Sequence, residues 1–188
     1  MRFFHNDYNE LCHQSVMQRM LDLQNVQMDG YGMDTCCDHA AEMIRKLCGD
    51  EKLSVHFIPG GTQTNVTVLA ASLRPHQAVI GADCAHIHVH ETGALEGTGH
   101  KIIALPSVSG KISAEQINNI VTLHWNDDSH EHMAQPKMVY ITNPTEMGTL
   151  YSLAELEAIS AVCKEQNLFL FVDGARMGYG LMSEKNDI

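Results

Sequence analysis

Residues 59–65 of this sequence, Pro-Gly-Gly-Thr-Gln-Thr-Asn, have the composition of an anion-binding turn and stand immediately before a helical pattern. Two glycines allow the backbone to approach a ligand, and a helix start offers free N–H groups at the positive end of its dipole. Gly61 and Thr62 are therefore candidate phosphate ligands. The segment matches neither G-x-x-x-x-G-K-[ST] nor G-x-G-x-x-G. A simple strand-to-helix turn capped by Thr62 is the alternative.

A second candidate is Asp173, which begins the run Asp-Gly-Ala-Arg directly after the apolar segment 168–172. A carboxylate at the end of a buried strand is costly unless it meets a partner. The protonated nitrogen of a bound pyridine ring would be such a partner. An ion pair with Arg176 or a helix cap are the alternatives that the sequence leaves open.

Three histidines alternate along the chain at His86, His88 and His90. On a strand they would share one face, so a zinc site and a metal-dependent hydrolase are the weakest alternative considered. We expect instead that a turn separates the rings before a helix starting at about Glu91, and that one histidine faces the site. His56 lies inside an apolar run and is expected in the core.

The elements that must position these residues follow from hydrophobic periodicity and capping signals. Helices are predicted at 35–48 with Thr35 as a cap, 62–73, 113–123 and 152–166. Strands are predicted at 54–58, 78–80, 101–105, 138–142 and 168–172. The last strand is apolar on both faces and is therefore expected at the centre of a parallel sheet.

Strands that alternate with helices predict an α/β fold with a mostly parallel sheet and helices on both faces. Ligands of such sheets gather at the carboxyl ends of the strands. We treat residues 1–188 as one partial large domain that includes a short N-terminal segment, 1–33. The candidate ligands after residues 58 and 172 should then meet at one edge.

Composition narrows the possible partners. The chain of 188 residues is 44% apolar and carries a net charge of −11, which disfavours nucleic acid and anionic membranes as partners. No run approaches the length of a membrane span, and the start lacks the apolar core of a signal peptide. We therefore expect a cytoplasmic protein.

Five motifs in order give the sequence a family resemblance. They are Gly30-Tyr31-Gly32-Met33-Asp34, Gly60-Gly61-Thr62-Gln63-Thr64-Asn65, Ala85-His86, Asn143-Pro144-Thr145-Glu146-Met147-Gly148-Thr149 and Val172-Asp173-Gly174-Ala175-Arg176. Together they resemble the threonine aldolase and aromatic amino acid β-eliminating lyase family. Its members are pyridoxal 5'-phosphate (PLP) enzymes of fold type I, which is the aspartate aminotransferase-like fold.

The resemblance implies a role for each candidate residue. Gly61 and Thr62 would bind the cofactor phosphate, and Asp173 would pair with the ring nitrogen. His86 would stack on the pyridine ring and help proton transfer, while Arg176 would lie beside cofactor and substrate. The implied substrate is a small β-hydroxy amino acid such as L-threonine or L-allo-threonine, which is cleaved to glycine and acetaldehyde. Family members are homodimers or homotetramers with active sites at subunit interfaces.

Two further positions follow from the resemblance. Asn6-Asp7 would lie close to the site, and Glu146 stands where some aldolases have a histidine, so Glu146 becomes a candidate base. Family members place the cofactor-binding lysine one strand beyond the Asp-Gly-Ala-Arg motif, followed by a small C-terminal domain. This sequence ends at Ile188, before either feature.

Four lysines that follow the phosphate motif are not expected to replace the family lysine. The candidates that we considered are Lys101, Lys137, Lys164 and Lys185. We therefore expect an incomplete large domain with impaired activity and uncovered apolar sheet surface. The alternative is a noncatalytic remnant that binds PLP weakly or pairs with a full-length relative.

Overall fold

The computed structural model describes residues 5–183 and divides the chain into two compact units, Met1–Phe57 and Ile58–Ile188. Within the first unit, two helices are formed, α1 (Gln14–Leu23) and α2 (Thr35–Cys48). The second unit contains the sheet and all the candidate residues that follow the phosphate motif. Within residues 5–183, no helix combines the length and the hydrophobicity needed to cross a membrane.

Helix α2 has the bounds that the sequence predicts, but its cap differs. The carboxylate of Asp34, not the hydroxyl of Thr35, accepts hydrogen bonds from the N–H groups of Cys36 and Cys37. A carboxylate two or three residues before those N–H groups has the reach that an N-cap needs. At the other end, Gly49 adopts the left-handed conformation, with φ of 66°, and closes the helix.

The prediction of a strand at 54–58 is wrong, because this segment forms neither helix nor strand. A β-prone sequence becomes a strand only when a neighbouring strand completes its hydrogen bonds, and no described strand pairs with it. His56 is consequently exposed, which corrects its expected place in the core.

The second unit is built on a four-stranded parallel sheet with the strand order β2-β1-β3-β4. The strands are β1 (Gln77–Ala82), β2 (Lys101–Leu105), β3 (Gln135–Thr142) and β4 (Phe169–Asp173). These four match the predicted strands to within a few residues. The predicted central position of the last strand is wrong for the described chain, because β4 forms the edge and its Phe169 is 48% exposed.

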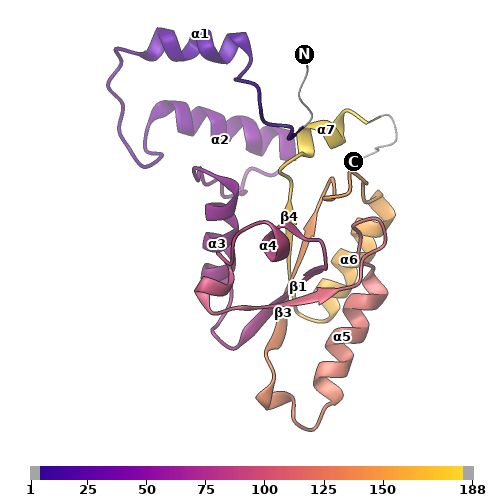
Figure 1. Ribbon diagram of the computed structural model, residues 1–188. Helices are drawn as coiled ribbons and strands as arrows, with labels where there is room; N and C mark the ends of the chain where they lie inside the picture. Colours follow the sequence, from indigo (N-terminus) through magenta and orange to yellow (C-terminus); the bar gives the residue numbers. More distant parts are fainter. Residues whose placement is uncertain (1–4, 184–188) are drawn as a thin grey trace. The chain divides into compact units, whose positions relative to one another are not determined.

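Helices cover both faces of this sheet, as predicted. The helices of this unit are α3 (Gly61–Ser72), α4 (His86–Val89), α5 (Ala114–Asn126), α6 (Leu153–Glu165) and α7 (Met177–Leu181), with 3₁₀ turns at Glu96–Thr98 and His130–His132. Helices α5 and α6 lie on one side of the sheet, and α3 and α4 lie on the other (Figure 1). The strand order explains why α4 lies opposite α5 and α6, because right-handed crossovers that step in opposite directions leave their helices on opposite faces.

Both predicted capping boxes are formed, and they fix where α5 and α6 begin. Ser113 exchanges hydrogen bonds with Gln116, and Ser152 does so with Glu155. Between the helices, β1 and β3 form the centre of the core, with Ile80 and Val139 fully buried. The core therefore holds the central strands rigidly, so that their carboxyl ends present side chains at one edge.

Candidate active site

The turn before α3 forms an open backbone cradle. Gly60 has φ of 115° and is the N-cap residue, without any side-chain capping bond, and the helix begins at Gly61. Thr62 is therefore inside the first turn, and the alternative in which its hydroxyl caps the helix is wrong. A Cβ atom added at Gly60 or Gly61 would meet no atom within 4 Å. The space beside these two glycines is open, and the first-turn N–H groups, which have no partners inside a helix, are suited to bind an anion.

Asp173 ends β4 and accepts hydrogen bonds from three donors. The hydroxyl of Tyr140 lies 2.6 Å from Oδ2, Nδ2 of Asn65 lies 3.4 Å from Oδ2, and the N–H of Ala175 lies 2.9 Å from Oδ1. A carboxylate has about four lone-pair positions, so about one is left for a ligand. Burial, followed by the adjacent Asp173, raises the pKa of Tyr140 far above its usual range. Tyr140 therefore stays protonated and donates its hydrogen bond to Asp173.

Asn65 connects Asp173 to the cradle. It lies on α3 four residues after Gly61, which corresponds to a rise of about 6 Å along the helix. Since its amide donates to Asp173, the backbone cradle and the carboxylate lie at the same edge of the sheet, joined by one turn of α3 and the side chain of Asn65. A single small ligand with an anionic group at one end and a basic nitrogen at the other can reach both.

His86 belongs to the same network through Glu91. Nδ1 of His86 lies 2.8 Å from Oε1 of Glu91, and Nδ2 of Asn65 donates to that same oxygen over 2.7 Å. The Glu91 side chain is completely buried, whereas that of His86 is 38% exposed, so the imidazole keeps an accessible face. We call His86, Glu91, Asn65, Asp173 and Tyr140 the site network.

The local fold around His86 corrects two expectations. The helix begins at His86 rather than near Glu91, and Glu91 follows it in a turn that brings its carboxylate back to His86. His88 and His90 are exposed, with the ring of His90 centred 5.7 Å from that of His86. In the described part of the chain, no group of three or more His, Cys, Asp or Glu side chains is arranged to hold a metal ion. The zinc alternative therefore has no structural support.

Glu146 and Arg176 approach each other in the same unit. Nη1 of Arg176 lies 3.6 Å from Oε2 of Glu146, while the other oxygen, Oε1, is buried and has no hydrogen-bond partner among residues 5–183. A buried acceptor without a donor is uncommon and marks a position where a further group could bind. Glu146 and Arg176 are the two motif residues assigned to catalysis beside His86, and they thus lie close to each other.

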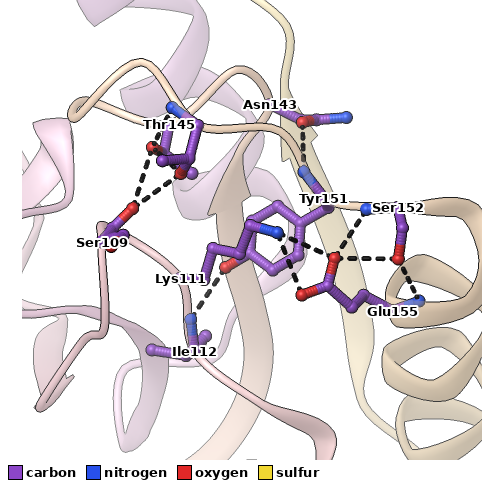
Figure 2. A network of polar contacts seen from close by, with 9 residues as sticks. Ser109, Lys111, Ile112, Asn143, Thr145, Tyr151, Ser152 and Glu155 are labelled. Atoms are coloured by element: carbon purple, nitrogen blue, oxygen red, sulfur yellow. Dashed lines mark hydrogen bonds and ion pairs between the residues drawn. The ribbon is translucent and has the colours of Figure 1, made fainter. Parts of the chain in front are cut away.

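A separate set of polar contacts, which we call the scaffold network, holds the loop that carries Glu146 (Figure 2). It consists of Ser109, Lys111, Ile112, Asn143, Thr145, Thr149, Tyr151, Ser152 and Glu155. At the start of the loop, Oδ1 of Asn143 accepts from the N–H of Tyr151. The hydroxyl of Thr149 donates to the carbonyl of Ser109 over 2.6 Å. The loop is therefore fixed at both ends.

The comparisons with known proteins agree with this geometry. The sequence model of the family described as Beta-eliminating lyase matches residues 12–179. This chain belongs to the β-eliminating lyase family. Curated relatives include the low specificity L-threonine aldolase of Pseudomonas aeruginosa, which is 32% identical over 177 residues, covering 93% of this chain and 49% of the relative.

Solved structures place this β-eliminating lyase chain in the same fold. It superposes on the threonine aldolase of Leishmania major with a TM-score of 0.92 and 45% identity, over 97% of this chain and 52% of that one. A putative L-allo-threonine aldolase of Listeria monocytogenes has a TM-score of 0.67 at 24% identity, covering 89% of this chain and 45% of that one. The chain thus spans about half the length of the relatives that it matches.

Three residues of the site network in this β-eliminating lyase chain were missed by reasoning from sequence. Asn65 stood inside a quoted motif without a role, Glu91 was seen only as the start of an expected helix, and Tyr140 only as part of a strand. The alternation of β3 could have singled out Tyr140, since a hydroxyl on a buried strand needs a partner. Asn6 and Asp7 belong to the other unit, so their expected proximity to the site stays a prediction.

Proposed function

We propose that this chain is the PLP-binding part of an amino-acid lyase of the threonine aldolase type. The observation that carries the proposal is the contact between Asn65 and Asp173, because it brings the anion cradle at the start of α3 and the carboxylate that would pair with a ring nitrogen to the same edge of the sheet. The family membership and the threonine aldolase relatives support the same conclusion. In this reading, residues 1–188 form a partial PLP-binding large domain.

The residues present fit PLP. The N–H groups at Gly61 and Thr62 would bind its phosphate, and Asp173 would hold a proton on its ring nitrogen. The half-exposed imidazole of His86 would stack on the ring. When bound, PLP supplies an electron sink for negative charge that develops on the amino acid. Tyr140, held protonated by burial, would keep Asp173 in its acceptor role.

Glu146 and Arg176 would act on the substrate side. We assign Arg176 to a place beside the cofactor and the amino acid, and Glu146 to accepting the proton of the β-hydroxyl group. The unpartnered Oε1 of Glu146 supports this assignment, since an incoming hydroxyl would supply its missing donor. The proposed substrate class is a small β-hydroxy amino acid, with L-threonine cleaved to glycine and acetaldehyde.

Three described lysines of the sheet-containing unit support noncovalent binding, while Lys185 lies outside the described residues. Lys111 donates two hydrogen bonds to Glu155, and Lys137 donates to the carbonyl of Asn167. Lys101 opens β2 at the amino edge of the sheet, opposite the carboxyl edge where Asp173 lies. We therefore propose that the chain alone binds PLP without a covalent bond and cleaves L-threonine slowly or not at all. Its cytoplasmic location and homo-oligomeric state stay predictions from the sequence.

Titration of the purified chain with PLP, followed by quenching of the single tryptophan and by cofactor absorbance, tests the proposal. Saturable binding that is lost on replacing Gly61 with a bulkier residue, Gly61→Val, is the expected result. Failure of the wild-type chain to bind PLP would refute the assigned site. Treatment with borohydride should leave no pyridoxyl-lysine adduct, and acetaldehyde release from L-threonine should stay near background. A stable adduct with turnover would instead show that one of the present lysines serves.

A further inference from the structure

Glu91 occupies the centre of the site network without belonging to any of the motif roles. Its side chain is completely buried, and its Oε1 contacts both Nδ1 of His86, at 2.8 Å, and Nδ2 of Asn65, at 2.7 Å. Its Oε2 is buried and has no hydrogen-bond partner among the described residues. Burial of a carboxylate costs free energy unless its oxygens accept hydrogen bonds. The contacts of Glu91 with His86 and Asn65 therefore fix the positions of both side chains.

The hydrogens of these contacts can be assigned from donor and acceptor chemistry. The amide nitrogen of Asn65 only donates, so Oε1 of Glu91 acts as an acceptor toward it. That same oxygen then accepts from Nδ1 of His86 as well, which requires a hydrogen on Nδ1. In a neutral imidazole the other nitrogen, Nε2, is consequently the unprotonated and basic atom.

We propose that Glu91 is a positioning residue that holds His86 in the Nδ1–H tautomer, so that Nε2 is the atom available to accept a proton. Asn65 extends this control, because its single amide group donates both to Glu91 and to Asp173. The ring that would stack on the cofactor and the carboxylate that would hold the ring nitrogen are thus set by one amide group. The proposal rests on the proposed PLP site for its function, while the tautomer itself is a property of the chain without cofactor.

If Glu91 only supported the local fold, either ring nitrogen of His86 could carry the hydrogen. The tautomer of His86 is therefore the decisive measurement. The chain is labelled with ¹⁵N-histidine, and the ring nitrogens are recorded without cofactor at about pH 8, where an ordinary histidine is neutral. The signals of His86 are identified by their loss in His86→Asn. We expect a pyrrole-type Nδ1 and a pyridine-type Nε2 in the wild-type chain. The opposite pattern would overturn the proposal without any change at Glu91.

Glu91→Gln is the matched variant, since it keeps the shape of the side chain while its amide can donate as well as accept. We expect it to release His86 toward the Nε2–H tautomer. Glu96→Gln removes the same charge from an exposed carboxylate five residues later and should leave His86 unchanged. An unchanged tautomer in Glu91→Gln would contradict the proposal.

PLP titration of the same samples separates this proposal from the proposed function. Glu91→Gln should weaken cofactor binding roughly tenfold, as expected when a charge-assisted hydrogen bond is lost, and Glu96→Gln by less than about twofold. If the wild-type chain binds no PLP, the proposed function fails, and the tautomer spectra still decide the role of Glu91. If PLP binds and both variants bind it equally well, the positioning role fails while the cofactor site stands.

Discussion

The site network and the scaffold network are two polar clusters of the same unit, and they differ in how completely their buried polar groups are hydrogen-bonded. In the scaffold network, donors and acceptors are matched across neighbouring loops, as when Tyr151 accepts from the N–H of Ile112 (Figure 2). Among residues 5–183, the buried side-chain oxygens without a partner are Oε2 of Glu91 and Oε1 of Glu146. One lies in the site network, and the other is the proposed base.

This difference indicates what each cluster is for. A saturated network lowers the free energy of the folded state and keeps a loop in one conformation. An unsaturated one costs stability and is retained where a ligand completes it. The two networks should therefore respond to mutation in opposite ways, with ligand affinity lost in one and folding stability lost in the other.

The largest effect is expected for Asp173→Asn. The substitution removes the charge that would hold the cofactor ring nitrogen, so PLP affinity should fall about 100-fold, the size of a lost hydrogen bond between charged groups. Asp83→Asn makes the same change just beyond the carboxyl end of β1, outside the site network, and should alter the affinity less than about twofold. PLP titration measures both variants. Equal affinity of Asp173→Asn and the wild-type chain would break the distinction between the networks.

The scaffold network should respond to Gly110→Ala through folding stability. Gly110 has φ of +82°, and a Cβ atom there would lie 2.7 Å from Oγ1 and 2.9 Å from Cβ of Thr145. Strain and displacement of Thr145 should lower the free energy of unfolding by about 1–3 kcal/mol, measured by urea denaturation. PLP affinity should change much less than in Asp173→Asn. Gly97→Ala is the control, because a Cβ atom there meets nothing within 4 Å.

A third region, at the amino edge of the sheet, should account for part of the acid sensitivity of folding. His124 is buried, and this burial, followed by the nearby His130, lowers its pKa, while Asp127 opposes the shift. The side chain of His124 lines a cavity of about 470 Å³. Lys101 and His132 line this cavity as well.

The sign of the pH effect follows from the lowered pKa of His124. Near neutral pH the ring is uncharged in both the folded and unfolded states, and its contribution to stability is fully present. As the pH falls below about 6.5, the unfolded chain binds a proton before the folded chain does, so the free energy of unfolding decreases. The loss continues until the pH has passed the lowered pKa of the folded state.

Urea unfolding at about pH 7.5 and about pH 5.5 measures this effect, with the fluorescence of Trp125, the only tryptophan of the sequence, as the probe. His124→Gln should lose less stability between the two pH values than the wild-type chain does. His132→Gln, which changes an exposed histidine of the same cavity, should behave like the wild-type chain. An identical loss in all three proteins would place the acid sensitivity elsewhere.

The smallest effect is expected for Lys111→Met, which removes one ion pair from the scaffold network. Lys111 lowers the pKa of Glu155, but the two side chains are 24% and 44% exposed, so water screens their attraction. The free energy of unfolding should fall by about 0.2–1 kcal/mol, less than in Gly110→Ala. Lys164→Met, at an exposed position of α6, serves as the control for loss of charge. A loss greater than that of Gly110→Ala would show that the pair, not the loop packing, holds the scaffold.

Local sequence signals were sufficient for most of the sheet-containing unit. The capping boxes at Ser113 and Ser152, and the apolar runs of β2 and β3, depend on residues within a few positions of each other. Such signals can be recognised without knowing the fold. The prediction of a strand at 54–58 was wrong because a strand needs a partner strand. The residues of the segment itself do not specify that partner.

Short-range patterns in the sequence were enough to predict the alternation of strands and helices, the glycine turn before α3 and the family that this chain resembles. The contacts by which Asn65, Glu91 and Tyr140 join His86 to Asp173 became visible in the folded chain alone. The contact between Asn65 and Asp173 spans 108 positions of sequence. Which donor meets which acceptor over such a separation depends on strand order and crossover direction, and these are properties of the assembled sheet.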